Sequence, residues 1–293
     1  ALKTSDGTTS SLIAGLSDSY GYIAGVGINA RFFYIRSFIQ LSISNVILTD
    51  HEYHCLRSVD RTTNQTSTYS GNCTTRGNRD GVNALFYRPA SIIADLMNSQ
   101  QLIISESNSR SLKTINTVSK RVSIFYRDIT NRYRLSYVLQ DAETGNIYVT
   151  FDHGVGLYDY KSRTFSEITG SSWSGFVDGE FSQLRFYSPR ELAFLSSSTL
   201  LAADQGNNRL RVLDLRTNTS SSICSGARGH ADGDFASCSL FIPLSLLKVN
   251  DTIYIGEGGF IRTMQGKNHF NASLKISDLK LFSPNTLSPT RMI

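Results

Sequence analysis

Residues 178–226 decide the fold, and they read DGEFSQLRFYSPRELAFLSSSTLLAADQGNNRLRVLDLRTNTSSSICSG. The same plan starts again at Asp232 as DGDFASCSLFIPLSLLKVNDTIYIGEGGFIRTMQG, and it occurs upstream from Asp80 as DGVNALFYRPASIIADLMNSQQLIISESNSRSLKTINTVSKRVSIF. Each copy has a glycine turn, an aromatic-x-x-Pro step and then short strand-like runs. A chain that resembles itself at a period of about 45–55 residues is built from structural repeats.

The clearest copy predicts four short strands, separated by clusters of Ser, Asn, Asp and Gly. The expected strands are Arg190–Leu195, Thr199–Ala203, Arg209–Leu213 and Ser220–Cys224. Their apolar runs of about four to six residues are too short for helices, and no helical periodicity is present. Four antiparallel strands in each repeat are typical of a β-propeller blade.

The repeats align on the residue at the end of the second strand, which is acidic in four copies and aromatic in one. These residues are Asp50, Glu106, Phe151, Asp204 and Glu257. The step that leads into each repeat recurs as Phe86–Pro89, Phe186–Pro189 and Phe241–Pro243, with Phe32 and no proline in the first copy. A sixth step is present at Leu281–Pro284.

These repeats predict a single β-propeller domain over residues 1–293. Its modules cover approximately residues 26–71, 81–126, 134–170, 179–226 and 233–277, with a partial sixth module at 281–293. Residues 10–15, SSLIAG, look like the last strand of a blade, and such an N-terminal strand would close the ring and remove exposed edges. We therefore expect six blades. The alternative is a five-bladed ring with the C-terminal segment packed outside it.

The repeat resembles the NHL repeat, whose pattern is a DG turn, an A-x-F-x-x-P step and a strand ending in D-x-x-N-x-R-I-R. The match is best in AADQGNNRLRVLDL (Ala202–Leu215), good in DGVNALFYRPASI, and poor in the third module. The resemblance extends from about Ser10 to Pro284 and implies an all-β propeller. It implies little about function, because one fold can host enzymes, RNA-binding proteins and adhesion modules.

Composition and charge leave several functional classes open. The net charge is +5, from 29 Lys and Arg against 24 Asp and Glu, but the basic residues are scattered. The densest basic stretch is residues 121–135, which includes Arg127, Arg132 and Arg134. It predicts either an elongated hairpin between the second and third blades or an edge that contacts a partner. No apolar run reaches the length of about 18 residues that a membrane span requires.

The four cysteines fall into two local pairs. Cys55 and Cys73 flank neighbouring strands of one module, whereas Cys224 ends a strand shortly before Cys238. We propose the disulfides Cys55–Cys73 and Cys224–Cys238, although four cysteines allow three pairings and four unrelated buried thiols are the alternative. Zinc is disfavoured, because no C-x-x-C occurs and no histidine has ligand spacing beside the cysteines.

Five N-x-S/T sequons provide candidate glycosylation sites: Asn64, Asn72, Asn218, Asn250 and Asn271. Asn64 and Asn218 hold the same position in two modules, at the turn between the third and fourth strands. Asn250 lies in a turn between the first and second strands. Together with paired cysteines, these positions favour the secretory pathway and an extracellular or cell-surface location.

Catalytic chemistry has few candidates in this sequence. His51, His54 and His153 occur just after second strands, where a propeller lyase could hold a metal, but no histidine position repeats. The acids Asp50, Glu106, Asp204 and Glu257 could hold calcium. Alternatively, each acid ties a turn, together with an arginine five positions later, such as Arg209 after Asp204. No nucleotide-binding loop or nucleophile elbow is present. We expect no catalytic residue, metal or cofactor.

The sequence therefore predicts a non-enzymatic extracellular glycoprotein that mediates protein–protein adhesion or assembly through its loops. Its partner would be another extracellular or membrane glycoprotein, or copies of itself, with no nucleic acid and no membrane contact except through an anchor outside this chain. Trp173 is either a plug between blades or an exposed contact for a partner. The architecture, sequons and cysteines are similar to those of the flagellar adhesion glycoproteins of trypanosomatid parasites. The alternatives are a metal-dependent lyase or hydrolase and an RNA-binding NHL domain.

Overall fold

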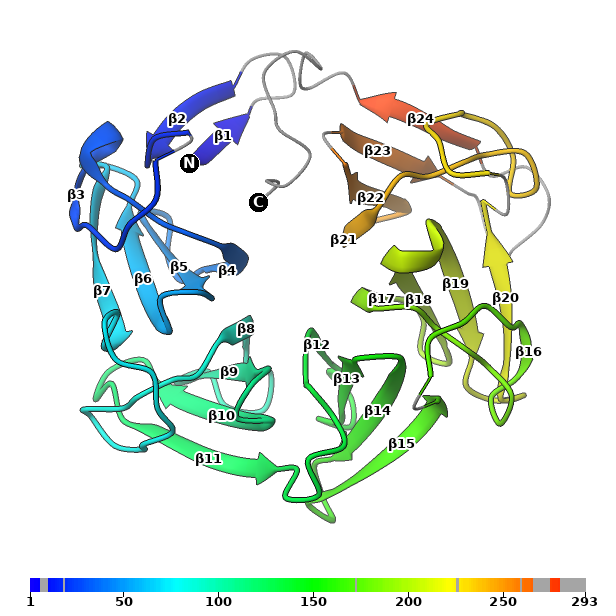
Figure 1. The fold of residues 1–293 in the computed structure, drawn as a ribbon, viewed down its shortest axis with the longest axis horizontal. Coiled ribbons are helices and arrows are strands. Elements are labelled where there is room, and N and C mark those ends of the chain that lie inside the picture. Colours follow the sequence, from blue (N-terminus) through cyan, green and yellow to red (C-terminus); the bar gives the residue numbers. More distant parts are fainter. Residues whose placement is uncertain are drawn as a thin grey trace. The chain divides into compact units, whose positions relative to one another are not determined.

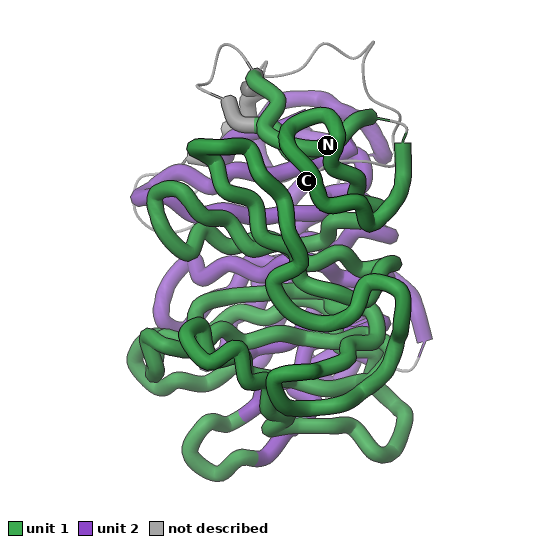
Figure 2. The backbone as a smooth tube through the Cα atoms, turned by 90° about the vertical axis from the view of Figure 1, so that its left-hand side faces the viewer, with its two compact units in different colours: residues 1–147, 159–163, 293 green, residues 148–158, 164–292 purple. Residues whose placement is uncertain are grey.

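The computed structural model describes residues 1–5, 10–17, 19–171, 173–224, 227–258, 260–265 and 275–279. These residues form β-strands joined by turns, with two short 3-10 segments. The chain divides into two compact units, which Figure 2 shows in two colours. The first unit is Ala1–Ile147 with Asp159–Arg163, and the second is Tyr148–Tyr158 with Thr164–Met292. None of the described helices has the length and apolar character that crossing a membrane requires.

The first unit contains two complete blades (Figure 1). The first blade is a sheet of order β3-β7-β6-β5-β4 and the second a sheet of order β11-β10-β9-β8. The strands of the first blade are β3 (Gly25–Val26), β4 (Ile35–Gln40), β5 (Asn45–Asp50), β6 (Cys55–Asp60) and β7 (Gln65–Gly71). Those of the second are β8 (Pro89–Ala94), β9 (Gln101–Glu106), β10 (Ser111–Asn116) and β11 (Val122–Arg127).

Three further blades follow in chain order, with strand orders β12-β13-β14-β15, β16-β20-β19-β18-β17 and β21-β22-β23-β24 (Figure 1). The third consists of β12 (Val138–Gln140), β13 (Ile147–Phe151), β14 (Gly154–Asp159) and β15 (Thr164–Gly170). The fourth consists of β16 (Gly179–Glu180), β17 (Pro189–Ser196), β18 (Thr199–Asp204), β19 (Arg209–Asp214) and β20 (Thr219–Ile223). The fifth consists of β21 (Pro243–Val249), β22 (Thr252–Glu257), β23 (Phe260–Gln265) and β24 (Lys275–Leu279). The protein is therefore an all-β propeller with five blades in its described residues.

The expected count of six blades is not supported, whereas the five-bladed alternative is. The sixth lead-in step, Leu281–Pro284, lies outside the described residues. The expected closing strand forms as β2 (Ser10–Ala14), but it pairs with β1 (Leu2–Ser5) in a separate two-stranded sheet. The physical reason is that β24 already pairs with the outer edge of β23, so the fifth blade takes its fourth strand from its own stretch of chain.

Apolar side chains between consecutive blades form the core of each unit. In the first unit they are Ile47, Leu56, Ala84, Phe86, Ile92, Leu102, Ile104, Ile115 and Val122. In the second unit they include Ala193, Leu201, Ala203, Leu210, Ile223, Leu240, Leu246, Ile253, Ile255 and Met264. Burying one large apolar side chain stabilises the folded state by about 1.5–3 kcal/mol. A single blade cannot bury its own apolar face, so the contacts between neighbouring blades stabilise the fold.

The basic stretch at residues 121–135 is not a hairpin, contrary to one of the two expectations. Its first half is β11, the fourth strand of the second blade, where Val122 pairs with Ile115 of β10. The residues that follow form a loop around the buried Asp128, whose carboxylate accepts hydrogen bonds from the backbone N–H groups of Thr130 and Tyr133. Residues 121–127 are therefore part of a blade, and the loop after them leads into the third blade.

Side chains on the first strand of one blade accept backbone hydrogen bonds from the first strand of the next blade within each unit. In the first unit, Ser37 Oγ accepts the N–H of Ile92 at 3.2 Å and Ser91 Oγ accepts that of Val138 at 3.4 Å. In the second unit the corresponding acceptor is a glutamate. Glu191 Oε2 accepts the N–H of Leu246 at 2.9 Å, and burial raises the pKa of this carboxyl from 4.5 to about 7.

This carboxyl makes folding stability depend on pH. Between pH 4.5 and 7 the folded chain holds a proton on Glu191 that the unfolded chain releases, so its contribution to stability falls as pH rises through this window. We expect the free energy of unfolding of Glu191→Gln to exceed that of the wild type by up to about 3 kcal/mol at pH 8, and by much less at pH 4.5. Urea denaturation of both proteins at the two pH values measures the difference. If the free energies of unfolding of the wild type and the variant differed by the same amount at both pH values, the prediction would be contradicted.

Candidate functional site

The four acids at the ends of the second strands are fully buried, and each accepts a hydrogen bond from the lead-in segment of its own blade. The donor is the backbone N–H of the residue two positions before the first strand. The donor–acceptor pairs are Phe33–Asp50 (3.4 Å), Tyr87–Glu106 (2.7 Å), Tyr187–Asp204 (2.9 Å) and Phe241–Glu257 (2.8 Å). These acids therefore fix the path of the chain into the blade.

Each buried acid also has a buried cation as its partner. The cation lies on the strand that follows the acid in the same blade, namely β6, β10, β19 or β23. The nitrogen–oxygen distances are 3.8 Å for Arg57–Asp50, 3.1 Å for Lys113–Glu106, 3.0 Å for Arg211–Asp204 and 3.2 Å for Arg262–Glu257. The expectation that Arg209 pairs with Asp204 is wrong. The Arg209 guanidinium lies over the Phe176 ring at 3.8 Å, and Arg211, two residues later, reaches the acid. Because a cation already balances each carboxylate, these acids have a structural role and are poorly suited to hold calcium.

The third blade replaces both members of this pair. Phe151 stands where the acid would be, and Gly156 stands where the arginine or lysine would be. A Cβ atom on Gly156 would come within 2.2 Å of the Phe165 ring, so that ring occupies the space of the missing cation. The joint loss of acid and base fits electrostatics, because removing one partner alone would leave a buried charge uncompensated.

The candidate metal-binding histidines have other contacts. His51 Nε2 lies 3.3 Å from the Arg36 guanidinium and its Nδ1 lies 3.1 Å from Glu52. His54 Nδ1 accepts the N–H of Arg88, and burial lowers the pKa of His54. The His153 ring contacts the ring of Tyr187, with 6.1 Å between centroids. In the described part of the chain no three His, Cys, Asp or Glu side chains are grouped as metal ligands would be.

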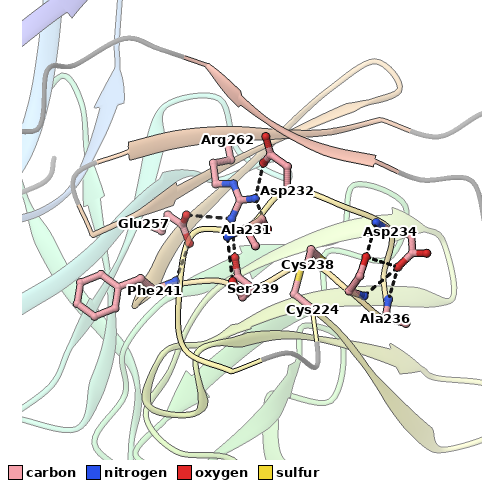
Figure 3. The surroundings of a disulfide bond; sticks show 11 residues. Cys224, Ala231, Asp232, Asp234, Ala236, Cys238, Ser239, Phe241, Glu257 and Arg262 are labelled. Atoms are coloured by element: carbon pink, nitrogen blue, oxygen red, sulfur yellow. Dashed lines mark hydrogen bonds and ion pairs between the residues drawn. A yellow bond between two sulfur atoms is a disulfide. The ribbon is translucent and has the colours of Figure 1, made fainter.

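Both expected disulfides are present, Cys55–Cys73 and Cys224–Cys238, with Cα–Cα distances of 5.0 and 4.5 Å. The second joins the end of β20 to the lead-in loop of the fifth blade (Figure 3). In the same loop, Ala231 and Ser239 present backbone carbonyls to the buried guanidinium of Arg262. The disulfide and the buried ion pair therefore hold one loop together.

Four of the five sequon asparagines lie in described turns. Asn64, Asn218 and Asn250 have φ between 53° and 56°, a left-handed conformation that asparagine tolerates well. Asn72, Asn218 and Asn250 are exposed, whereas Asn64 is half-buried. Asn271 lies outside the described residues. A tight turn is thus one physical reason for asparagine at three of these positions.

Trp173 is 75% exposed, so its interpretation as a plug between blades is wrong. Its indole ring therefore lies on the surface of the second unit, and its backbone N–H donates to Ser171 Oγ at 3.1 Å. The side chains of Arg127, Arg132 and Arg134 are exposed on the first unit, and the Arg132 guanidinium lies 5.2 Å from the Tyr133 ring centroid.

Sequence reasoning missed a cluster of aromatic side chains in the first blade, with three members on its lead-in segment and one in the turn between β5 and β6. Tyr20 packs on Phe33 with 4.9 Å between ring centroids, Phe33 on Tyr53 at 6.0 Å, and Tyr53 on Tyr22 at 5.1 Å. We call these four residues the aromatic surface. Tyr20, Tyr22 and Phe33 remain 48%, 47% and 44% exposed, and Ile23 beside them is 56% exposed. A cluster of exposed apolar side chains is a candidate interaction site.

The buried pair of the first blade positions this aromatic surface. In other blades the buried cation also contacts an outer acid, as Arg211 does with Asp178 at 2.7 Å. Arg57 instead donates to the carbonyls of Ile23 at 3.1 Å and Arg31 at 3.3 Å, in the two segments that carry the rings. Burial raises the pKa of its partner Asp50 to about 6, because the opposing effect of the Arg57 charge on this pKa is smaller than the effect of burial.

Comparisons with known proteins place the chain by fold alone. No family model and no curated protein matches it, so the resemblance to the NHL repeat and to the flagellar adhesion glycoproteins is not confirmed. A nidogen/laminin complex has a TM-score of 0.56 at 13% identity, covering 79% of this chain and 75% of that one. An auxiliary nutrient binding protein from Bacteroides ovatus has a TM-score of 0.54 at 13% identity, and the match covers 91% of this chain and 75% of that one. A streptogramin B lyase has a TM-score of 0.56 at 12% identity, and the match covers 86% of this chain and 70% of that one.

Proposed function

We propose that residues 1–293 form one propeller domain of a non-enzymatic extracellular glycoprotein, and that its aromatic surface mediates protein–protein adhesion or assembly. The observation that carries this proposal is the cluster of Tyr20, Tyr22, Phe33 and Tyr53, whose rings contact one another while the first three stay substantially exposed. Large aromatic side chains provide most of the binding energy at many interfaces. The Arg57 guanidinium donates to the Arg31 carbonyl and the Asp50 carboxylate accepts from the Phe33 N–H, and these bonds hold the segments in place, which lowers the entropic cost of binding.

The partner proposed is another extracellular or membrane glycoprotein, or a second copy of this chain. Nucleic acid is disfavoured because disulfides and sequons are typical of proteins outside the cytosol and nucleus. Two disulfides support an oxidising compartment, and sequons in exposed turns support glycosylation there. Any membrane attachment would use an anchor outside this chain. Trp173 and the arginines Arg127, Arg132 and Arg134 are proposed as separate partner contacts.

The similar structures support both binding and enzymatic functions, since they include nutrient binding proteins and a lyase. The contacts of the histidines favour binding. A metal at His51 would compete with the Arg36 guanidinium for the lone pair of Nε2. The NHL-type module stays part of the proposal on the strength of its DG turn, aromatic–Pro step and buried acid.

Replacing two rings of the aromatic surface tests the proposal. We expect the double variant Tyr20→Ser/Phe33→Ser to bind the surface of cells that carry the partner at least about tenfold more weakly than the wild type. Titration of fluorescently labelled domain onto such cells measures this affinity, and sedimentation velocity measures self-association. Ile43→Ser is the matched control, because Ile43 is apolar and 91% exposed but belongs neither to the aromatic surface nor to the other proposed contacts.

Equal binding by the wild type and the double variant would contradict this site. Loss of binding in Trp173→Ser alone would move the site to the second unit. A stoichiometric metal in the purified protein, detected by elemental analysis, would instead favour the lyase or hydrolase alternative.

A further inference from the structure

A large groove lies beside the aromatic surface in the first unit, with a volume of about 970 Å³. One wall is the end of β7 and the turn after it, residues 68–74, and the other wall is the lead-in loop of the second blade, residues 79–85. Tyr22 and Arg121 complete the lining. The groove therefore lies along the connection that runs from β7 of the first blade to β8 of the second.

The lining is mixed in character, with polar groups that lack partners. Ser70 is only 8% exposed, and neither its hydroxyl nor that of Tyr69 has a hydrogen-bond partner among the described residues. Arg121 has an exposed side chain at the rim. These two hydroxyls lie beneath the surface of the groove, whereas the exposed side chains of Asn72, Thr74 and Arg121 give the groove itself a polar lining.

Asn72, a sequon asparagine, forms part of the groove wall. Its Oδ1 accepts hydrogen bonds from the backbone N–H of Thr74 at 2.9 Å and from the Thr74 hydroxyl at 2.7 Å. Both of these hydrogen bonds use Oδ1, so Nδ2, the atom that carries an N-linked sugar, is not engaged by them, and the residue is exposed.

The other described sequons differ from this one. Thr66, the hydroxyl residue of the Asn64 sequon, is fully buried. Ser220, the hydroxyl residue of the Asn218 sequon, donates to Asp178 at 3.1 Å. Asn250 is exposed in a turn and does not line the groove. Asn72 thus combines an exposed sequon with an adjacent groove.

We propose that an N-glycan on Asn72 folds back into this groove and fills it. This inference rests on the proposed glycoprotein function. Sugars present hydroxyls and apolar ring faces together, which suits a lining of Tyr22, Arg79 and Arg121 along with polar threonine and asparagine. Covalent attachment at the wall gives the glycan a high effective concentration there, so weak contacts are sufficient. Since Tyr22 belongs to both features, the glycan would border the aromatic surface.

Site-resolved removal of glycans tests this inference on protein secreted by a eukaryotic host. Native protein is treated with peptide N-glycosidase, and glycopeptide mass spectrometry follows each sequon over time. We expect release from Asn72 to be at least about tenfold slower than from Asn250 in the folded protein, and equally fast after denaturation and reduction.

A matched pair of arginine variants separates groove binding from simple crowding near the attachment point. Arg121→Ser should speed release at Asn72 alone, because Arg121 lines the groove. Arg127→Ser should leave it unchanged, because Arg127 is also an exposed arginine, at the C-terminal end of β11, and does not line the groove.

The outcomes that overturn the inference are distinct from the failure of the proposed function. The inference alone would be overturned if Asn72 carried no glycan while other sequons did, or if the release rates at Asn72 and Asn250 were equal in the folded protein. It would also be overturned if Arg121→Ser and Arg127→Ser had equal effects. A secreted chain with no glycan on any sequon would overturn the glycoprotein proposal as well.

Discussion

Replacing Arg211 with methionine is expected to lower the free energy of unfolding by about 3–5 kcal/mol, because the buried Asp204 carboxylate loses its cation. Both side chains are fully buried, and the Arg211 guanidinium donates to Asp204 at 3.0 Å and to Asp178 at 2.7 Å. It also donates to the Arg185 carbonyl at 2.9 Å. Urea denaturation followed by circular dichroism measures the loss.

Two further variants show whether the buried charge is the cause. Arg216→Met is the matched control, because Arg216 pairs with Asp214 at 3.7 Å in the same blade but is 76% exposed, and it should cost less than about 1 kcal/mol. In the double variant Asp204→Asn/Arg211→Met, the asparagine keeps an acceptor for the Tyr187 N–H without a charge. We expect the double variant to be about 2 kcal/mol more stable than Arg211→Met. A double variant no more stable than the single one would refute the electrostatic explanation.

Removing the disulfide with the double variant Cys224→Ser/Cys238→Ser is expected to destabilise the protein by about 3 kcal/mol, as chain-entropy theory gives for a loop of this size. The two cysteines are separated by 14 residues and are both fully buried. The loss should be greatest in the lead-in loop of the fifth blade, where Ala231 and Ser239 hold Arg262 (Figure 3).

Thermal unfolding and hydrogen exchange of the variant measure the size and place of this effect. Reduction of the wild-type protein should produce the same destabilisation in the fifth blade. If reduction and the double variant both left the unfolding transition unchanged, the disulfide would have no stabilising role.

The sequence predicted the strands of the clearest repeat well. The expected strands Arg190–Leu195, Thr199–Ala203 and Arg209–Leu213 are confirmed as β17, β18 and β19 with ends shifted by one residue. These strands are specified locally, by short apolar runs between turn residues. The blade count and the role of β2 were not predictable in the same way, because they depend on which distant strand pairs with the chain ends.

The candidate site was predicted less well than the fold, for physical reasons that differ from residue to residue. Both disulfides followed from neighbouring strands. The partner of Asp204 was misplaced by two residues, because spacing alone does not show that Arg209 turns toward Phe176. The aromatic surface was missed because exposure depends on tertiary packing, although the dense aromatics of YGYIAGVGINARFFY, residues 20–34, were a visible signal.

The proposed function depends on passage through the secretory pathway, and the intact mass of the secreted chain tests that passage most directly. The mass is measured before and after glycosidase, and with and without reductant in the presence of a thiol-labelling reagent. We expect a mass above that of the bare chain that glycosidase lowers, and labelling of all four cysteines only after reduction. An unglycosylated chain with four reactive thiols would contradict the extracellular glycoprotein proposed here.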